Sequence, residues 1–159
     1  MANTYTQIHI QAIFAVQDRE SLINKIWRER LYRYINAIIQ RQKHKVIAIG
    51  GTANHVHILI GQHKGQTISD LMREIKRGSS EWINHNKFVK GTFRWQSGYG
   101  AFSYSKDNIA GVAKYIEKQE EHHKKYTFTE EYKQILGEFD VEYNEQYIFH
   151  EIDRFDGTE

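Results

Sequence analysis

A six-residue run near the middle of the chain, His55-Val56-His57-Ile58-Leu59-Ile60, constrains the fold more than any other segment. Side chains of a β-strand alternate between the two faces of a sheet, so this run places both imidazoles on one face and Val56, Ile58 and Ile60 on the other. The apolar face predicts contact with a hydrophobic core. The opposite face carries two imidazoles on a rigid backbone, which suits a metal ion or a phosphate, although two ordinary histidines would give the same pattern.

The chain has 159 residues and no cysteine. This length suits one domain with a hydrophobic core of its own. The absence of cysteine excludes thiolate zinc sites, thiol nucleophiles and disulfides. No segment has the apolar length of a signal peptide or a membrane span, so we expect a soluble cytoplasmic protein that does not associate with membranes.

Charge is distributed unevenly along the chain. The net charge is +2, but residues 127–159 contain ten acidic side chains and only Lys133 and Arg154 as basic ones, a local charge of −8. Residues 1–126 therefore carry +10. This excess predicts that the larger part of the chain binds a polyanion and that the acidic tail lies outside that surface. A mixed, solvated surface is the alternative.

The expected elements follow the order β-α-β-β-α-β, and a third helix comes after them. Their ranges are 4–16 (strand), 21–43 (helix), 46–50 and 55–60 (strands of a hairpin), 67–86 (helix capped by Thr67), 93–104 (strand interrupted at 98–100) and 105–124 (helix). This order predicts an α+β fold, a ferredoxin-like or RRM-like split βαβ sandwich with helices on one face of an antiparallel sheet. The other face is expected to be open, to carry His55 and His57, and to hold the last helix, which contains Tyr115.

The last expected helix contains Tyr115 and Gln119, one turn apart beside an apolar stripe. A tyrosine in such a position is ordinary in packing, and a glutamine is ordinary in contact with solvent. The helix by itself therefore does not indicate chemistry, and a functional interpretation needs the other motifs.

Three separated motifs together resemble those of the HUH single-tyrosine transposases, the TnpA type with its IS-two-hundred-like and REP-associated members. They are His55-Val56-His57, the segment Trp95-Gln96-x-Gly98-Tyr99-Gly100-Ala101-Phe102-Ser103, and the segment Tyr115-Ile116-x-x-Gln119-x-x-His122-His123-Lys124. The resemblance covers about residues 4–125, and the motifs stand in the order of the family. One difference precedes the first histidine, where the family usually has Pro-Asp and this chain has Ala53-Asn54.

The resemblance implies a reaction and the residues that perform it. Tyr115 would be the nucleophile that cleaves and rejoins single-stranded DNA at hairpin-containing element ends through a 5′-phosphotyrosine intermediate. His55, His57 and Gln119 would bind one Mg²⁺ or Mn²⁺, and these ligands leave coordination positions for phosphate oxygens.

The resemblance also implies a division of the chain into two parts and the formation of a homodimer. Residues 1–125 would form the HUH transposase domain, and residues 126–159 an acidic C-terminal extension packed on the same domain. The family works as a homodimer, in which Gly98 and Gly100 would let the tyrosine-bearing helix cross to the partner. Thr127 with Glu130 resembles a capping box for a helix in the extension.

Weaker candidates for DNA contacts are basic and aromatic residues, namely Arg73, Lys76, Arg77, Trp95 and Tyr99. A solvated helix face for the basic residues and core packing for the aromatic ones are the alternatives. His9 and His122 are candidates for contacts with the metal ligands. If His122 or His123 replaced Gln119 as a ligand, zinc would also fit.

Two other functions fit the same residues. One is a domesticated or inactive relative that binds hairpin DNA without cleaving it. The other is a metal-dependent phosphoesterase that uses water as the nucleophile.

Overall fold

The fold is given by a computed structural model, which describes residues 3–144. Its elements are β1 (His9–Ala15), η1 (Gln17–Arg19), α1 (Lys25–Arg41), β2 (Lys45–Gly51), β3 (His55–Gly61), α2 (Ile68–Asn86), β4 (Gly100–Tyr104), η2 (Lys106–Asn108), α3 (Ile109–Glu117), α4 (Gln119–His122) and α5 (Phe128–Glu138). The strands form one antiparallel sheet in the order β2-β3-β1-β4. The predicted ferredoxin-like α+β fold is therefore confirmed.

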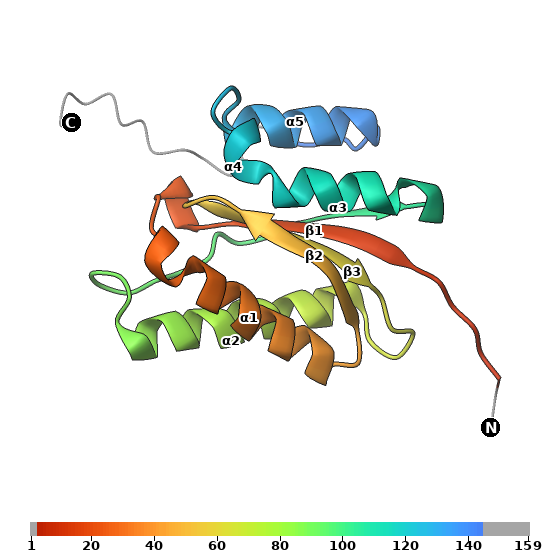
Figure 1. The fold of residues 1–159 in the computed structure, drawn as a ribbon, viewed down its shortest axis with the longest axis horizontal. Coiled ribbons are helices and arrows are strands. Elements are labelled where there is room, and N and C mark those ends of the chain that lie inside the picture. The colour runs from red at the N-terminus through yellow and green to blue at the C-terminus, as the bar shows by residue number, and fades with distance from the viewer. Residues whose placement is uncertain (1–2, 145–159) are drawn as a thin grey trace.

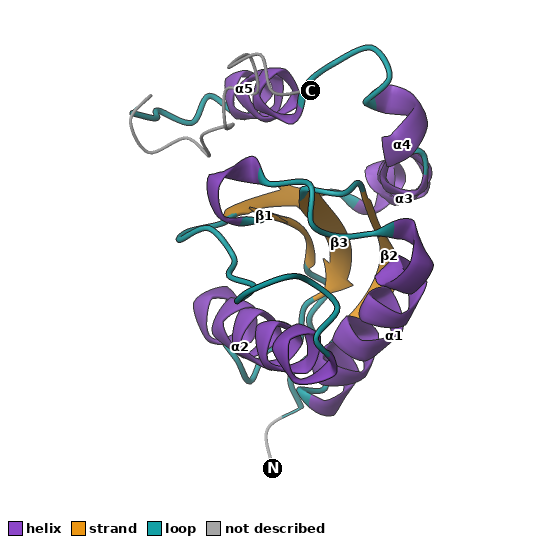
Figure 2. Ribbon diagram, turned by 90° about the vertical axis from the view of Figure 1, so that its left-hand side faces the viewer, coloured by secondary structure: helices purple, strands orange, loops and turns teal. Residues whose placement is uncertain are grey.

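Helices cover both faces of this sheet. α1 and α2 pack together beneath one face, and α3, α4 and α5 lie over the other (Figure 1 and Figure 2). The tyrosine-bearing helix lies on the predicted face. That face is not open to solvent, however, because α5 covers it as well, and His55 and His57 are fully buried. No helix among the described residues is long and apolar enough to cross a membrane.

Strand alternation separates the two layers as predicted. Val56, Ile58 and Ile60 of β3 join the main hydrophobic core beneath the sheet, where α1 and α2 supply the facing side chains. His55 and His57 point to the opposite layer. The hairpin of β2 and β3 pairs Gly50 with His57 and so fixes the register of the histidines.

The boundaries of the first two elements differ from the predicted ones. β1 begins at His9 rather than at residue 4, and α1 begins after Asn24 rather than at Ser21. The Asn24 side chain accepts a hydrogen bond from the Ile26 backbone N–H, which makes it the cap of the helix. Ile26 is exposed, whereas Trp27 is buried in the core.

The glycines expected to act as a hinge lie on the wrong side of β4. Gly98 precedes the strand with a φ of 87°, and Gly100 is its first residue. β4 then pairs with β1 as far as Tyr104, before α3 begins. A hinge at these glycines would not free α3 without breaking this pairing, so that interpretation is wrong.

The helix expected over residues 105–124 is divided. Lys118, with φ −101° and ψ 22°, separates α3 from α4, and the η2 turn precedes them. The capping box of Thr127 and Glu130 at the start of α5 is confirmed. α5 continues through Gly137 and ends at Glu138.

α5 packs on the sheet beside β1 and β4. Its apolar side chains form a second core with residues of β1 and β4, and the members of this core include Ile13, Ala15, Phe102, Phe128, Tyr132, Ile135 and Leu136. The remainder of the predicted extension, residues 145–159, lies outside the described residues.

α3 approaches β2 closely at Gly50. A Cβ atom added to Gly50 would lie 2.2 Å from the Ile116 carbonyl oxygen, a distance that a real side chain does not tolerate. Only glycine therefore permits this packing. Because Ile116 follows Tyr115 directly, the close approach also fixes the height of the tyrosine above the sheet.

We predict that Gly50→Ala lowers the free energy of unfolding by about 2 kcal/mol or more, since either α3 or β2 must move. The control is Gly111→Ala, in α3, where an added Cβ meets nothing within 4 Å. This control should raise stability by about 0.5–1 kcal/mol because alanine favours the helix. Urea unfolding measures both. Equal stabilities for the two variants would contradict the packing argument.

Candidate active site

Polar side chains from five separated segments converge over the buried histidine face of the sheet. Hydrogen bonds, ion pairs and ring contacts link them into one group. We call it the histidine–glutamate cluster, and its members are Gln11, His55, His57, Tyr115, Gln119, His122, His123 and Glu131. The structure thus brings together the predicted nucleophile, all three predicted metal ligands and His122.

Glu131 lies at the centre of the cluster. Its Oε1 is 3.1 Å from His57 Nε2 and 3.1 Å from His123 Nε2. Its Oε2 accepts hydrogen bonds from the Tyr115 hydroxyl and from Gln119 Nε2, the latter at 3.0 Å. The side chain is 2% exposed, so these contacts replace water around the carboxylate.

The Glu131 carboxyl is ionised despite its position. Burial raises the pKa of this carboxyl, but the hydrogen bonds with His123 and His57, followed by the electrostatic influence of His57, lower the pKa by more. Its negative charge acts on the tyrosine. Burial first, and then the charge of Glu131, raise the pKa of the Tyr115 phenol. Activation of this phenol therefore needs positive charge close to it.

His55 is held through Nδ1, which leaves Nε2 facing the cluster. Its Nδ1 is 2.7 Å from Asn54 Oδ1 and 3.0 Å from Thr52 Oγ1. The Thr52 hydroxyl donates to the same Asn54 oxygen, so this oxygen is an acceptor and the His55 Nδ1–H is the donor. Asn54 thus orients the imidazole, which is the role an aspartate before the histidine would have.

His57 is oriented in the same way from the neighbouring strand. Its Nδ1 is 2.8 Å from Gln11 Oε1, and Gln11 Nε2 donates to the Tyr104 hydroxyl at 2.8 Å. The oxygen of Gln11 therefore accepts the Nδ1–H of His57. Both imidazoles turn Nε2 toward Gln119 and Glu131.

The donor atoms fit a divalent cation. Burial, followed by His57 and His123, lowers the pKa of His55 well below its ordinary value, so this imidazole is neutral. With its hydrogen on Nδ1, His55 presents a nitrogen lone pair to Gln119 Oε1 at 3.0 Å. Two electron-rich atoms in this arrangement are stabilised by a cation that both can coordinate. His55, His57 and Gln119 are therefore suited to hold one.

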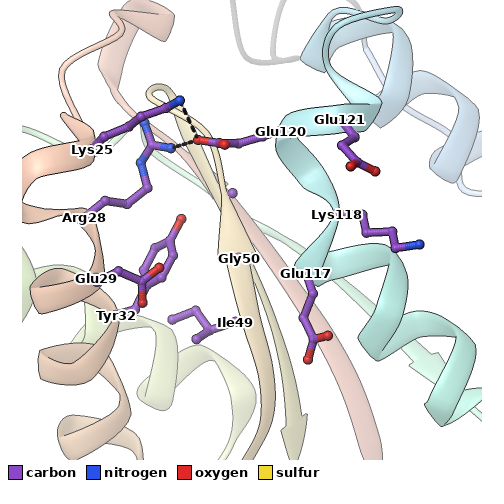
Figure 3. A pocket seen from close by; sticks show the side chains of 11 residues that line it. Lys25, Arg28, Glu29, Tyr32, Ile49, Gly50, Glu117, Lys118, Glu120 and Glu121 are labelled. Atoms are coloured by element: carbon purple, nitrogen blue, oxygen red, sulfur yellow. Dashed lines mark hydrogen bonds and ion pairs between the residues drawn. The ribbon is translucent and has the colours of Figure 1, made fainter.

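Glu120, the neighbour of Gln119, lines a cleft of about 550 Å³ (Figure 3). Arg28 of α1 donates to Glu120 Oε1 at 2.5 Å and to the Ile23 carbonyl at 2.8 Å. Lys25 Nζ lies 3.7 Å from the same Glu120 oxygen. These contacts tie α4 to α1. The cleft is lined by acidic as well as basic side chains, so it has no clear preference for an anion.

The predicted DNA-contact arginines lie away from the cluster. Arg73 and Arg77 are exposed on α2, in the layer beneath the sheet. Each pairs with an acidic residue three positions earlier, Asp70 at 3.1 Å and Glu74 at 2.7 Å. They remain accessible to a DNA backbone but do not adjoin Tyr115.

Lys76 also lies on α2 but faces the loop before β4. Its Nζ donates to the carbonyl oxygens of Gln96, at 2.8 Å, and Gly98. Burial lowers the pKa of Lys76 to about 8. The structure therefore uses this lysine to hold the loop in place.

The aromatic candidates pack at the edge of the main core. Trp95 makes edge contacts with Phe14 and Phe93, at ring-centroid distances of 4.7 and 4.8 Å, and its Nε1 donates to Ser79. Tyr99 is half-buried against the same core. In this structure Trp95 therefore packs in the core, which was the alternative to a DNA contact.

The remaining histidine candidates differ in their positions. His122 Nε2 lies 3.5 Å from Glu131 Oε2, and its ring is 5.3 Å from that of Tyr115. His9 is half-buried at the start of β1, and no hydrogen bond joins it to the cluster within the described part of the chain.

Sequence reasoning missed Glu131 because it gave the extension a packing role only. A signal was present in the pattern. The apolar positions 128, 132, 135 and 136 form a helical stripe, and Glu131 lies within it rather than on the solvent side. A carboxylate at such a position is buried only with partners, which indicates a polar site beneath the helix.

The chain resembles known transposases in sequence and fold. Residues 4–119 match the family model described as "Transposase IS200 like". A candidate transposase from Deinococcus radiodurans R1 shares the fold with a TM-score of 0.61 and 19% identity, over 75% of this chain and 95% of that one. A REP-associated tyrosine transposase bound to a REP hairpin gives a TM-score of 0.54 and 17% identity, over 73% of this chain and 68% of that one.

A search of curated proteins found no match to this chain. The family match nevertheless spans more than half of the chain and contains His55, His57, Tyr115 and Gln119. It ends before α5. The resemblance read from the three motifs is confirmed, and the chain belongs to the IS200-like transposase family.

Proposed function

We propose that this protein cleaves and rejoins single-stranded DNA at hairpin-containing element ends through a 5′-phosphotyrosine on Tyr115, with the help of a metal ion. Membership of the family implies DNA cleavage and strand transfer in general. One observation carries the finer proposal: the Tyr115 hydroxyl meets the side chains of His57 and Gln119 around a single carboxylate, although the three residues come from β3, α3 and α4.

The proposed reaction needs no ATP, because the energy of the broken phosphodiester is kept in the phosphotyrosine bond. The phenol oxygen of Tyr115 attacks the scissile phosphorus, which forms a Tyr–O–P bond and breaks the bond to the 3′ oxygen. The products are a 5′-phosphotyrosine and a free 3′-OH. In rejoining, a 3′-OH attacks the phosphotyrosine and the phenol leaves. The phenol hydrogen is held at Glu131 Oε2 before the attack and leaves the phenol oxygen as the Tyr–O–P bond forms, while the departing 3′ oxygen gains a hydrogen and becomes the 3′-OH.

The metal is proposed to lie beside the tyrosine. His55 Nε2, His57 Nε2 and Gln119 Oε1 would hold Mg²⁺ or Mn²⁺, which when bound stabilises negative charge on the phosphate oxygens. Phe128 stacks on His55 with a centroid distance of 4.0 Å and shields the site from water. Exclusion of water favours the tyrosine over hydrolysis.

The proposed partners are hairpin DNA and a second copy of the chain. The charge of +10 over residues 1–126 supports binding to a polyanion. The Tyr115 ring lies 6.1 Å from the His57 ring of the same chain. A single chain thus supplies the nucleophile and the proposed ligands, so a homodimer would not be needed to assemble the site.

Tyr115→Phe should abolish a covalent adduct while preserving the fold and DNA binding, because it removes one oxygen and little volume. The assay incubates the protein with a single-stranded hairpin and Mn²⁺ and detects an adduct that survives denaturing electrophoresis. Tyr126→Phe is the matched control, since Tyr126 is exposed and close to the site, and it should form the adduct normally. An adduct on Tyr115→Phe would reject this nucleophile, and cleavage without any adduct would favour the phosphoesterase.

His57→Ala should reduce cleavage by at least about a thousandfold, since it removes a proposed metal ligand. Hairpin affinity should change little because phosphate and stacking contacts supply it. His85→Ala, on the exposed end of α2, controls for the loss of a histidine. Cleavage by His57→Ala at the normal rate would remove His57 from the site. Binding without cleavage by the unaltered protein would identify an inactive, hairpin-binding relative.

Hairpin binding should weaken by about tenfold or more between 50 and 200 mM salt, because bound lysines and arginines release counterions from the DNA. Fluorescence anisotropy with a labelled hairpin measures the affinity. A perfect duplex of the same sequence should bind more weakly than the hairpin. Equal affinity for the two forms would count against a preference for unpaired DNA.

A further inference from the structure

Glu131 belongs to the part of the chain that lies beyond the family match, which ends at Gln119. It nevertheless sits deeper in the molecule than Tyr115 does, at 2% exposure, and contacts proposed ligands of the metal. A solvent-facing position was available on the same helix, because Gln134 and Glu138 are exposed. The inward position of a charged side chain therefore needs an explanation.

The hydrogen positions around Glu131 suggest an explanation for its inward position. His123 Nδ1 lies 2.8 Å from the Tyr126 carbonyl oxygen, which can only accept, so this nitrogen carries the hydrogen. His57 Nδ1 likewise donates to Gln11. Both imidazoles therefore turn Nε2, the nitrogen left for a metal ion, toward Glu131 Oε1, at 3.1 Å each.

The spacing of these atoms matches that of ligands around one cation. Two ligands at right angles, each about 2.1 Å from an octahedral ion, lie about 3.0 Å apart. Glu131 Oε1 is 3.1 Å from His57 Nε2 and 3.7 Å from His55 Nε2. The ligand atoms of these three side chains all lie within 4.8 Å of one another.

We propose that Glu131 is itself a ligand of the divalent cation, so that α5 completes the metal site of the transposase domain. The inference deepens the proposed function and rests on it in placing the cation at His55 and His57. A site with two imidazoles and a carboxylate is suited to Mn²⁺ and binds it more tightly than Mg²⁺, which prefers oxygen ligands and retains water. Binding of the cation then also favours docking of α5 on the sheet.

A different role for Glu131 makes the opposite prediction. If the carboxylate occupied the position of the cation and paired with a protonated histidine, its removal would vacate the site and tighten metal binding. If it is a ligand, its removal weakens binding. The direction of the change therefore decides between them.

The experiment titrates MnCl₂ into the full chain, without DNA, and measures affinity by calorimetry and by the electron paramagnetic resonance signal of free Mn²⁺. Glu131→Gln keeps the volume and removes the charge. Glu138→Gln makes the same change of charge at an exposed position of α5. We expect Glu131→Gln to weaken Mn²⁺ binding by about tenfold or more and Glu138→Gln to leave it unchanged. Equal or tighter binding by Glu131→Gln overturns the proposal.

A second measurement needs no variant. Addition of Mn²⁺ to the unaltered protein should slow hydrogen exchange of the α5 amides, because a ligand from α5 joins the helix to the site. Unchanged exchange in α5 at saturating Mn²⁺ overturns the proposal. Mn²⁺ binding that depends on His57 but not on Glu131 rejects the inference and leaves the proposed function intact. Binding that depends on Glu131 without any adduct on Tyr115 rejects the proposed function alone.

Discussion

The Glu131 carboxylate is charged and buried, and a buried charge is stable only when neighbouring groups replace the water it has lost. That replacement comes from His57 of β3, Tyr115 of α3, Gln119 of α4 and His123 after α4. Because these groups belong to different elements, one carboxylate fixes the position of α5 relative to the sheet and to both preceding helices. The carboxylate therefore joins α3, α4 and α5 to the sheet through polar contacts.

One face of the sheet carries the main hydrophobic core, and the other carries the histidine–glutamate cluster. Val56 and Ile58 contribute to an apolar core with α1 and α2, and this core contains no member of the histidine–glutamate cluster. Their strand neighbours His55 and His57 can then be held in a conformation that serves a site, since the core already fixes the backbone of β3. A rigid strand places catalytic groups more accurately than a loop would.

Two contacts near β2 hold the segments that carry Tyr115 and Gln119 in place. Gly50 lets α3 approach until Ile116 meets the strand, and the ion pair of Arg28 with Glu120 ties α4 to α1. Tyr115 is the residue before Ile116, which contacts Gly50, and Gln119 is the residue before Glu120, which pairs with Arg28. The break at Lys118 therefore does not separate their side chains, which both reach the same carboxylate oxygen.

The sequence by itself determined the features that depend on local periodicity. Alternation placed His55 and His57 on one face, and the capping residue Thr67 marked the start of α2. Only the tertiary structure decided that α5 closes over the histidine face and that Trp95 packs in the core rather than standing free. Glu131 is 74 residues from His57, and no local pattern specifies such a pair. The reason is physical: an amphipathic helix encodes which of its faces is buried, whereas the surface that buries it depends on contacts between distant parts of the chain.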